Sequence, residues 1–144
     1  MLDDFGLMPA LEHLLNDFAQ RTNIATRMDA STEEVEFGEP LSTSVYRVVQ
    51  EALTNVARHA EATEVELTVK LEADSVYVRV RDNGKGLAPR PSGETRSFGL
   101  LGIKERARTL GGRAQIYSPA EGGTIVEIAI PAARYRTTRS KDAA

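Results

Sequence analysis

The side chains with the clearest chemical use lie near the middle of the chain. Glu51 and Asn55 are four residues apart, so in a helix both project from one face, and His59 continues that line by a further turn. A carboxylate and a carboxamide oxygen are hard ligands that suit Mg²⁺, which binds few protein oxygens and keeps several waters and substrate phosphates. Arg58 and His59 then stand where they can meet phosphate oxygens. The alternative is that all four residues form only the solvated face of an amphipathic helix.

A second polar group follows an expected strand. The strand runs into Asp82-Asn83-Gly84-Lys85-Gly86. A carboxylate at a strand end can accept a hydrogen bond from a purine amino group, and the glycines allow close approach of the backbone. The alternative is an ordinary tight turn, for which Asp-Asn-Gly is equally suited.

Two glycine-containing segments come later in the chain. Gly99-Leu100-Leu101-Gly102 stands at the start of a helix, where unpaired amide groups and the positive end of the helix dipole attract phosphate. The alternative here is a hinge before an ordinary helix start. Gly122-Gly123-Thr124 lies between the last two expected strands, where a hairpin turn alone explains the glycines. Each signal is weak, but the four occur in one order on the element types that a nucleotide site requires.

Three stretches have the apolar spacing of helices. The pattern predicts helices over residues 9–20, 40–60 and 99–110. The middle helix is the longest, with an apolar stripe across about five turns formed by Leu41, Val45, Val48, Val49, Ala52, Leu53, Val56 and Ala60. Gly111 and Gly112 supply the left-handed stop that the end of the third helix favours.

Alternating apolar residues predict the strands. Residues 64–71 and 76–80 alternate around a turn-like segment and are expected to pair as antiparallel neighbours. Residues 113–118 and 124–130 indicate a hairpin, and residues 23–29 a short additional strand. Residues 87–98 have no period and are expected to form a loop. The order of elements predicts an α/β (α+β) two-layer sandwich, with helices on one face of a mixed, mostly antiparallel sheet.

Length and composition limit the classes of protein. A chain of 144 residues fits one domain, expected over residues 1–131, with a basic and disordered tail over residues 132–144. The formal charge of −3 gives no footprint for direct contact with nucleic acid or an anionic membrane. The absence of cysteine excludes a disulfide framework and thiolate metal sites, and suits the cytoplasm. No apolar run approaches the roughly 20 residues of a membrane helix, so we expect a soluble cytoplasmic domain, which leaves open a membrane-anchored parent protein.

Taken together, the motifs resemble those of the histidine-kinase ATPase superfamily, the group that includes gyrase, Hsp90 and MutL. Glu51-Ala52-Leu53-Thr54-Asn55 with Arg58-His59-Ala60 is similar to its N box, and residues 82–86 are similar to its G1 box. Residues 99–102 resemble its G2 box, and residues 122–124 its closing Gly-Thr motif. Residues 99–107 with Leu110-Gly111-Gly112 most resemble the histidine kinases that serve NarL-type response regulators. The resemblance covers about residues 2–131, which makes a chance motif match hard to sustain.

The resemblance implies a Bergerat ATP-binding fold, with ATP and magnesium held between the helix layer and a flexible lid. It implies that Asn55 holds magnesium, that Glu51 helps to order the water shell or the reacting group, and that Arg58 and His59 lie near the phosphates. It implies that Asp82 binds the adenine amino group in a pocket shaped by Gly84, Gly86 and Thr124. It also implies that Gly99, Leu100 and Gly102 let the lid and the start of the helix approach the phosphates. Residues 87–98 are then expected to become ordered when nucleotide binds.

The implied activity is that of a protein histidine kinase in two-component signal transduction. Such a kinase moves the terminal phosphoryl group of ATP to a histidine on a separate two-helix dimerisation domain, mainly by positioning and charge stabilisation. Neither His13 nor His59 stands in the Glu-Leu-His-Asp context of the family's acceptor. We therefore expect that this chain does not autophosphorylate alone. Its expected partners are ATP, the histidine-bearing dimerisation domain and, indirectly, a NarL-type response regulator.

Two alternatives share the expected fold. One is a free-standing serine kinase of the anti-sigma-factor type, against which the Lys104-Glu105-Arg106-Ala107 helix argues. The other is a non-catalytic module that binds nucleotide only to regulate a partner, since intact motif residues do not guarantee turnover.

Overall fold

The computed structural model describes residues 6–30, 36–37, 39–72, 74–85, 98–131 and 136–137, and at residues 36–37, 39–40, 59–60, 72, 98–100 and 136–137 it describes the backbone alone. Its helices are α2 (Leu7–Thr22), α3 (Glu39–Asn55), the π-helical turn η1 (Val56–Ala60) and α4 (Phe98–Thr109). Its strands are β1 (Ala25–Ala30), β2 (Glu36–Phe37), β3 (Glu64–Glu72), β4 (Ser75–Asp82), β5 (Arg113–Tyr117), β6 (Thr124–Pro131) and β7 (Arg136–Thr137).

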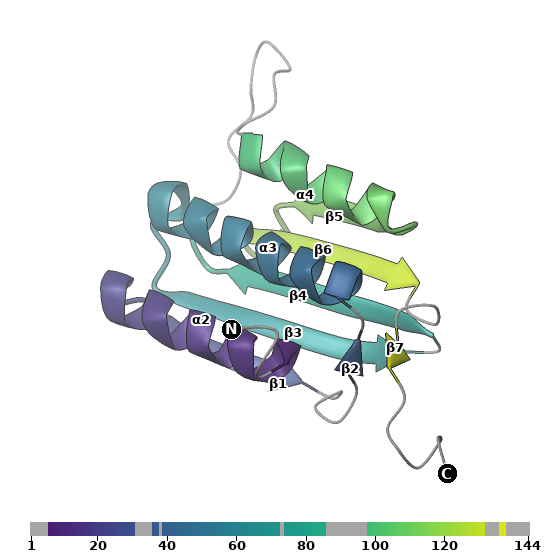
Figure 1. Ribbon diagram of the computed structural model, residues 1–144. Helices are drawn as coiled ribbons and strands as arrows, with labels where there is room; N and C mark the ends of the chain where they lie inside the picture. The colour runs from purple at the N-terminus through teal and green to yellow at the C-terminus, as the bar shows by residue number, and fades with distance from the viewer. Residues whose placement is uncertain are drawn as a thin grey trace.

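The described elements form two layers (Figure 1). Five strands make one sheet in the order β1-β3-β4-β6-β5, in which β1 is parallel to β3 and all other neighbours are antiparallel. Helices α2, α3 and α4 lie side by side on one face of this sheet, with α3 in the middle (Figure 1). The predicted two-layer α/β sandwich with a mostly antiparallel sheet is confirmed.

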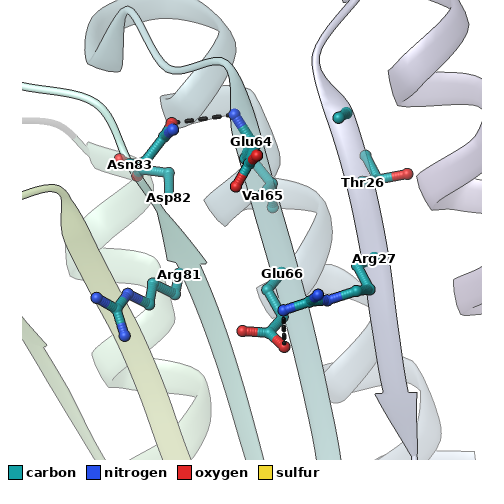
Figure 2. Close-up of a pocket in the computed structure, with 9 residues that line it drawn as sticks. Thr26, Arg27, Glu64, Val65, Glu66, Arg81, Asp82 and Asn83 are labelled. Carbon is teal, nitrogen blue, oxygen red and sulfur yellow. Dashed lines mark hydrogen bonds and ion pairs between the residues drawn. The ribbon is translucent and has the colours of Figure 1, made fainter.

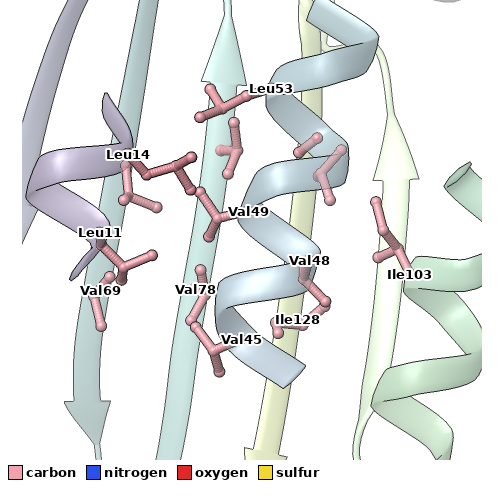
Figure 3. Close-up of a cluster of buried hydrophobic side chains, with 14 of the residues drawn as sticks. Leu11, Leu14, Val45, Val48, Val49, Leu53, Val69, Val78, Ile103 and Ile128 are labelled. Atoms are coloured by element: carbon pink, nitrogen blue, oxygen red, sulfur yellow. The ribbon is translucent and has the colours of Figure 1, made fainter. Parts of the chain in front are cut away.

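The hydrophobic core lies between the helix layer and the sheet, where the apolar faces of the helices pack on the apolar face of the strands. On the sheet, alternate apolar residues of β3, β4 and β6 are buried, with Thr68 and Ile125 buried in addition, and on α3 the buried residues follow the apolar stripe. Figure 3 shows the α3 side chains Val45, Val48, Val49 and Leu53 above β4 and β6, with Leu11 and Leu14 of α2 on one side and Ile103 of α4 on the other. Because α3 is fixed by this packing along its length, the polar residues on its remaining faces have defined positions.

The helix ends follow the expected chemistry with one difference. Gly111 ends α4 in a positive-φ conformation (84°), and the Gly112 amide donates to the Ala107 carbonyl at 2.8 Å, as in a Schellman cap. The middle helix, however, does not remain α-helical to residue 60, because η1 widens its last turn from Val56. A π turn holds more residues than an α turn, so the predicted line from Glu51 through Asn55 to His59 is interrupted after Asn55.

The segment expected to be a tail contains a short strand. Arg136–Thr137 forms β7, which pairs antiparallel with Glu36–Phe37 of β2. At these two residues the chain is paired rather than disordered, while residues 132–135 and 138–144 lie outside the described part. The expected domain limit at residue 131 stays a prediction.

Candidate functional site

The ends of four elements lie at the same end of the molecule. In Figure 1, α3 ends, β4 ends, and α4 and β6 begin toward the left of the view. The strands agree with this arrangement because Asp82, the last residue of β4, is the register partner of Thr124, the first residue of β6. On the helix layer, Gly102 in the first turns of α4 faces the Glu51 side chain of α3. The segments that carry the four sequence motifs therefore approach one another in pairs, across the sheet and across the helices.

Asn55 is the last residue of α3 and is half-buried. Its side-chain Nδ2 donates a hydrogen bond of 2.9 Å to the backbone carbonyl of Glu51. This bond fixes the amide plane and turns its oxygen away from that carbonyl. A carboxamide oxygen held in this way has the chemistry of a magnesium ligand. Among the residues that the structure describes, no group of three or more His, Cys, Asp or Glu side chains is placed to hold a metal ion.

The structure gives less information on Arg58 and His59 than on Asn55. Arg58 is exposed on η1 and lines a cavity of about 660 Å³ between α2 and α3, together with Glu51, Tyr46 and His13. His13 itself is exposed, as expected for a surface residue of α2. The His59 side chain lies outside the described atoms. The predicted contact of Arg58 and His59 with phosphates therefore stays a prediction.

Asp82 is a buried carboxyl group at the end of a central strand. The residue is only 4% exposed, and its Oδ1 accepts a hydrogen bond of 2.8 Å from the Gly84 backbone amide. Burial raises the pKa of Asp82 above its usual value, and hydrogen bonds from the backbone amides of Gly84 and Thr124 oppose that rise. A buried, acceptor-rich group of this kind is well suited to receive an N–H donor from a ligand.

Asp82 also borders a cavity of about 420 Å³ at the ends of β1, β3 and β4, lined further by Arg27, Glu66, Arg81 and Asn83 (Figure 2). The cavity of about 420 Å³ contains Asp82 and the cavity of about 660 Å³ contains Glu51, and Asn55 does not line either of them. Gly86 and residues 87–97 of the lid predicted over residues 87–98 lie outside the described residues, and Phe98 begins α4 rather than ending the loop. For Gly99 and Leu100 only the backbone is described, within α4. A single cavity shared by Asn55 and Asp82 therefore stays a prediction.

Asn83 has a structural role that the sequence did not indicate. Its Oδ1 accepts hydrogen bonds from the Thr63 and Glu64 amides at 2.9 and 3.0 Å, and its Nδ2 donates to Thr63 Oγ1 at 2.9 Å. These bonds tie the end of β4 to the start of β3. The sequence indicated only that Asn is common in turns. It could not indicate the hydrogen bonds of Asn83, because the partner residues are about 20 residues away and are brought close by the strand register.

Gly123 is a second residue whose tertiary contact the sequence did not indicate. It has a positive φ of 82°, and a Cβ at this residue would collide with the backbone carbonyl of Asp82. Gly122 also has a positive φ, of 106°, but a Cβ there would meet nothing within 4 Å. Both glycines are therefore required by the turn conformation, and Gly123 is required in addition by the close approach of the chain to Asp82.

We predict that Gly123→Ala is much more destabilising than Gly122→Ala. The strained backbone should cost each variant about 1–2 kcal/mol of unfolding free energy, and the collision with Asp82 should add about 1–3 kcal/mol for Gly123→Ala alone. Urea denaturation of the two variants beside the wild type measures the difference. Equal losses would mean that β6 does not press against the Asp82 backbone.

The described helices include none that is long and apolar enough to cross a membrane. This finding concerns only the residues that the structure describes.

Comparison with known proteins identifies a family and several relatives. Residues 41–134 match the family described as histidine kinase-, DNA gyrase B-, and HSP90-like ATPase. The signal transduction histidine-protein kinase/phosphatase DegS of Brevibacillus brevis is 35% identical over 130 residues, which cover 90% of this chain and 33% of that protein. The sensor histidine kinase MctS of Rhizobium johnstonii is 38% identical over 148 residues, which cover 100% of this chain and 32% of that protein. The chain thus spans about a third of the length of these relatives.

A solved structure supports the fold. The ATP-binding domain of PrrB from Mycobacterium tuberculosis superposes with a TM-score of 0.68 at 23% identity, covering 86% of this chain and 92% of that one. The matched family is one of ATPases, so ATP is the nucleotide that the match implies. Because the family match spans more than half of the chain and contains the N-box, G1, G2 and Gly-Thr segments, the chain belongs to the histidine kinase-, DNA gyrase B- and HSP90-like ATPase family.

Proposed function

We propose that this chain is the ATP-binding catalytic domain of a sensor histidine kinase, and that it donates the γ-phosphoryl group of ATP to a histidine on a dimerisation domain. The relatives support the kinase class, because DegS and MctS are both named as histidine kinases. The observation that carries the proposal is the buried Asp82 carboxylate, held by Gly84 and Thr124 at the end of the fold where α3 places Asn55.

In this proposal Asp82 binds the adenine end of the nucleotide. Its carboxylate accepts a hydrogen bond from the exocyclic amino group, and Gly84, Gly86 and Thr124 shape the surrounding pocket. An ionised acceptor that is shielded from water makes a stronger hydrogen bond than an exposed one, so burial helps recognition even though it raises the pKa. A purine with a carbonyl oxygen in place of this amino group would present an acceptor to an acceptor and be rejected.

The phosphates would lie toward the helix layer. The amide groups at the start of α4, around Gly99, Leu100 and Gly102, provide donors and the positive end of a helix dipole. Arg58 and His59 would approach the phosphates from η1. Asn55 would hold Mg²⁺, which neutralises charge on the phosphates and orients them. Glu51 would order the water shell of this ion or the reacting imidazole.

The reaction itself needs positioning more than covalent chemistry by the protein. An imidazole nitrogen of the acceptor histidine attacks the γ-phosphorus, the bond between that phosphorus and the β,γ-bridging oxygen breaks, and ADP leaves as the phosphorus–nitrogen bond forms. The imidazole proton passes to a nearby base or to water. Because the substrate is ATP, we place the domain in the cytoplasm, and we propose a NarL-type response regulator as the later acceptor of the phosphoryl group.

Transfer of labelled phosphate in trans tests this function. We predict that the chain, mixed with magnesium, γ-labelled ATP and a separate histidine-bearing dimerisation domain of its own parent protein, labels that domain with an acid-labile, base-stable phosphate. The chain incubated without the partner should stay unlabelled, because neither of its histidines has the acceptor context. Label on serine of a partner protein would instead support the serine kinase, and binding of ATP without any transfer would support the non-catalytic module.

A further inference from the structure

The Glu51 carboxylate lies between α3 and α4 with one of its oxygens buried and without a hydrogen bond among the described residues. This oxygen is Oε1. The carboxylate packs against Gly102 of α4, where an added Cβ would lie 3.2 Å from Oε1 and 3.7 Å from Oε2. The absence of a side chain at residue 102 therefore makes room for this carboxylate. A buried acceptor without a partner is costly, which indicates that the carboxylate is arranged for an interaction that is incomplete in this conformation.

Arg106 provides the missing half of that interaction. It lies four residues after Gly102, so it projects from the same face of α4 toward α3. Its Nη2 is 3.9 Å from Glu51 Oε2, which is an ion-pair distance but too long for a hydrogen bond. Its Nε is also buried and has no partner within the described part of the chain. One unpaired acceptor and one unpaired donor thus accompany a single stretched contact.

These atoms match the two halves of a bidentate bond. An arginine presents Nε and an Nη in a fixed fork, and a carboxylate presents two oxygens at the matching separation. A small shift of α4 toward α3 would shorten the existing contact and join the second pair of atoms. Lysine cannot replace the fork, because its ammonium group is a single point of charge.

We propose that Arg106 is a positioning residue for Glu51, and that the bidentate pair closes when α4 moves toward α3 in the reacting complex of nucleotide and acceptor histidine. This rests on the proposed function, in which Asn55 on α3 holds the magnesium and the start of α4 binds phosphate. Glu51 lies one turn before Asn55, and its backbone carbonyl accepts the Asn55 amide. Closing the pair therefore fixes the Glu51 carboxylate and joins the helix of the metal ligand to the helix of the phosphate donors.

The steady-state rates of transfer from ATP to the histidine-bearing domain test this role. We expect Arg106→Gln to lower kcat by about ten- to a hundredfold, since small misplacements of catalytic groups have effects of this size. The KM for ATP should change by less than about threefold, because an interaction completed only in the reacting complex affects kcat more than KM. Arg106→Lys should recover part of the lost rate. Arg108→Gln is the matched control, because Arg108 is exposed on the same helix, and it should keep the wild-type rate.

A charge exchange separates positioning from simple stability. The double variant Glu51→Arg with Arg106→Glu should recover the melting temperature lost by Glu51→Gln or Arg106→Gln, but not the transfer rate, because the carboxylate is needed at residue 51. Recovery of both would mean that the pair is only structural and would overturn the inference, as would wild-type kcat in Arg106→Gln. If the wild-type chain itself transfers no phosphate, it is the proposed function that fails.

Discussion

Asn55→Ala should lower the rate of phosphoryl transfer from ATP by on the order of 100-fold, the size of effect seen when one preorganised group that stabilises transition-state charge is removed. Asn55 is the only motif residue for which a metal-ligand role is proposed, and its amide is already oriented by the bond to the Glu51 carbonyl. Without its oxygen, magnesium would keep only phosphate and water ligands and would no longer be tied to α3. The measurement is the initial rate of labelling of the histidine-bearing domain at saturating ATP.

Thr54→Ala is the control for this variant. Thr54 is exposed and adjoins Asn55, and its hydroxyl donates a hydrogen bond to the Gln50 carbonyl in the same helix. It should transfer at the wild-type rate, and both variants should melt close to the wild-type temperature because neither side chain belongs to the core. A rate for Asn55→Ala within about threefold of Thr54→Ala would remove Asn55 from the catalytic assignment.

Asp82→Asn should weaken binding of adenine nucleotides by about 10- to 150-fold, the equivalent of losing a hydrogen bond to a charged group. The substitution keeps the size of the side chain and one oxygen that can accept from the Gly84 and Thr124 amides, but it replaces the second acceptor with an amide group that donates hydrogen bonds. That donor would face the adenine amino group. Displacement of a fluorescent ATP analogue measures the loss, and Asp74→Asn, an exposed change in the turn between β3 and β4, should bind as the wild type does.

Stability should change in the opposite sense to binding. Burial raises the pKa of Asp82 above the ordinary value of 3.8, so the folded protein holds a proton on this carboxyl more tightly than the unfolded chain does. The resulting stabilisation is complete below the unfolded pKa and is lost as the pH rises through the folded pKa. At pH 7 the Asn variant should therefore be as stable as the wild type or more so, and its advantage should shrink as the pH falls toward 3.8. A variant less stable at pH 7 would show that ionised Asp82 supports the fold.

The main elements could be predicted from the sequence because the forces that fix them are local and periodic. The apolar stripe of α3 and the alternation in β3 and β4 specify both the element and its buried face, and these residues are buried. The two-residue strands β2 and β7 could not be predicted, because two residues show no period. The π turn at Val56–Ala60 was hidden for a related reason, since its apolar residues continue the α-helical pattern.

For the candidate site, the sequence identified residue types but not their tertiary partners. Asp82 and Asn55 were identified from motifs, and the structure adds their burial and hydrogen bonds. The contacts of Arg106 with Glu51 and of Gly123 with Asp82 were not predicted, because each joins elements whose relative placement depends on the whole core. An arginine in an amphipathic helix is usually solvated, so no local pattern distinguished Arg106 from Arg108.

Asn55 and Asp82 should act on opposite ends of one nucleotide, and a binding experiment can show whether they do. Calorimetric titration with a nonhydrolysable ATP analogue, with and without magnesium, would be made on the wild type, Asn55→Ala and Asp82→Asn. We predict that magnesium strengthens binding to the wild type but not to Asn55→Ala, and that Asp82→Asn binds weakly in both conditions. Equal binding by all three proteins, with the same response to magnesium, would contradict this prediction.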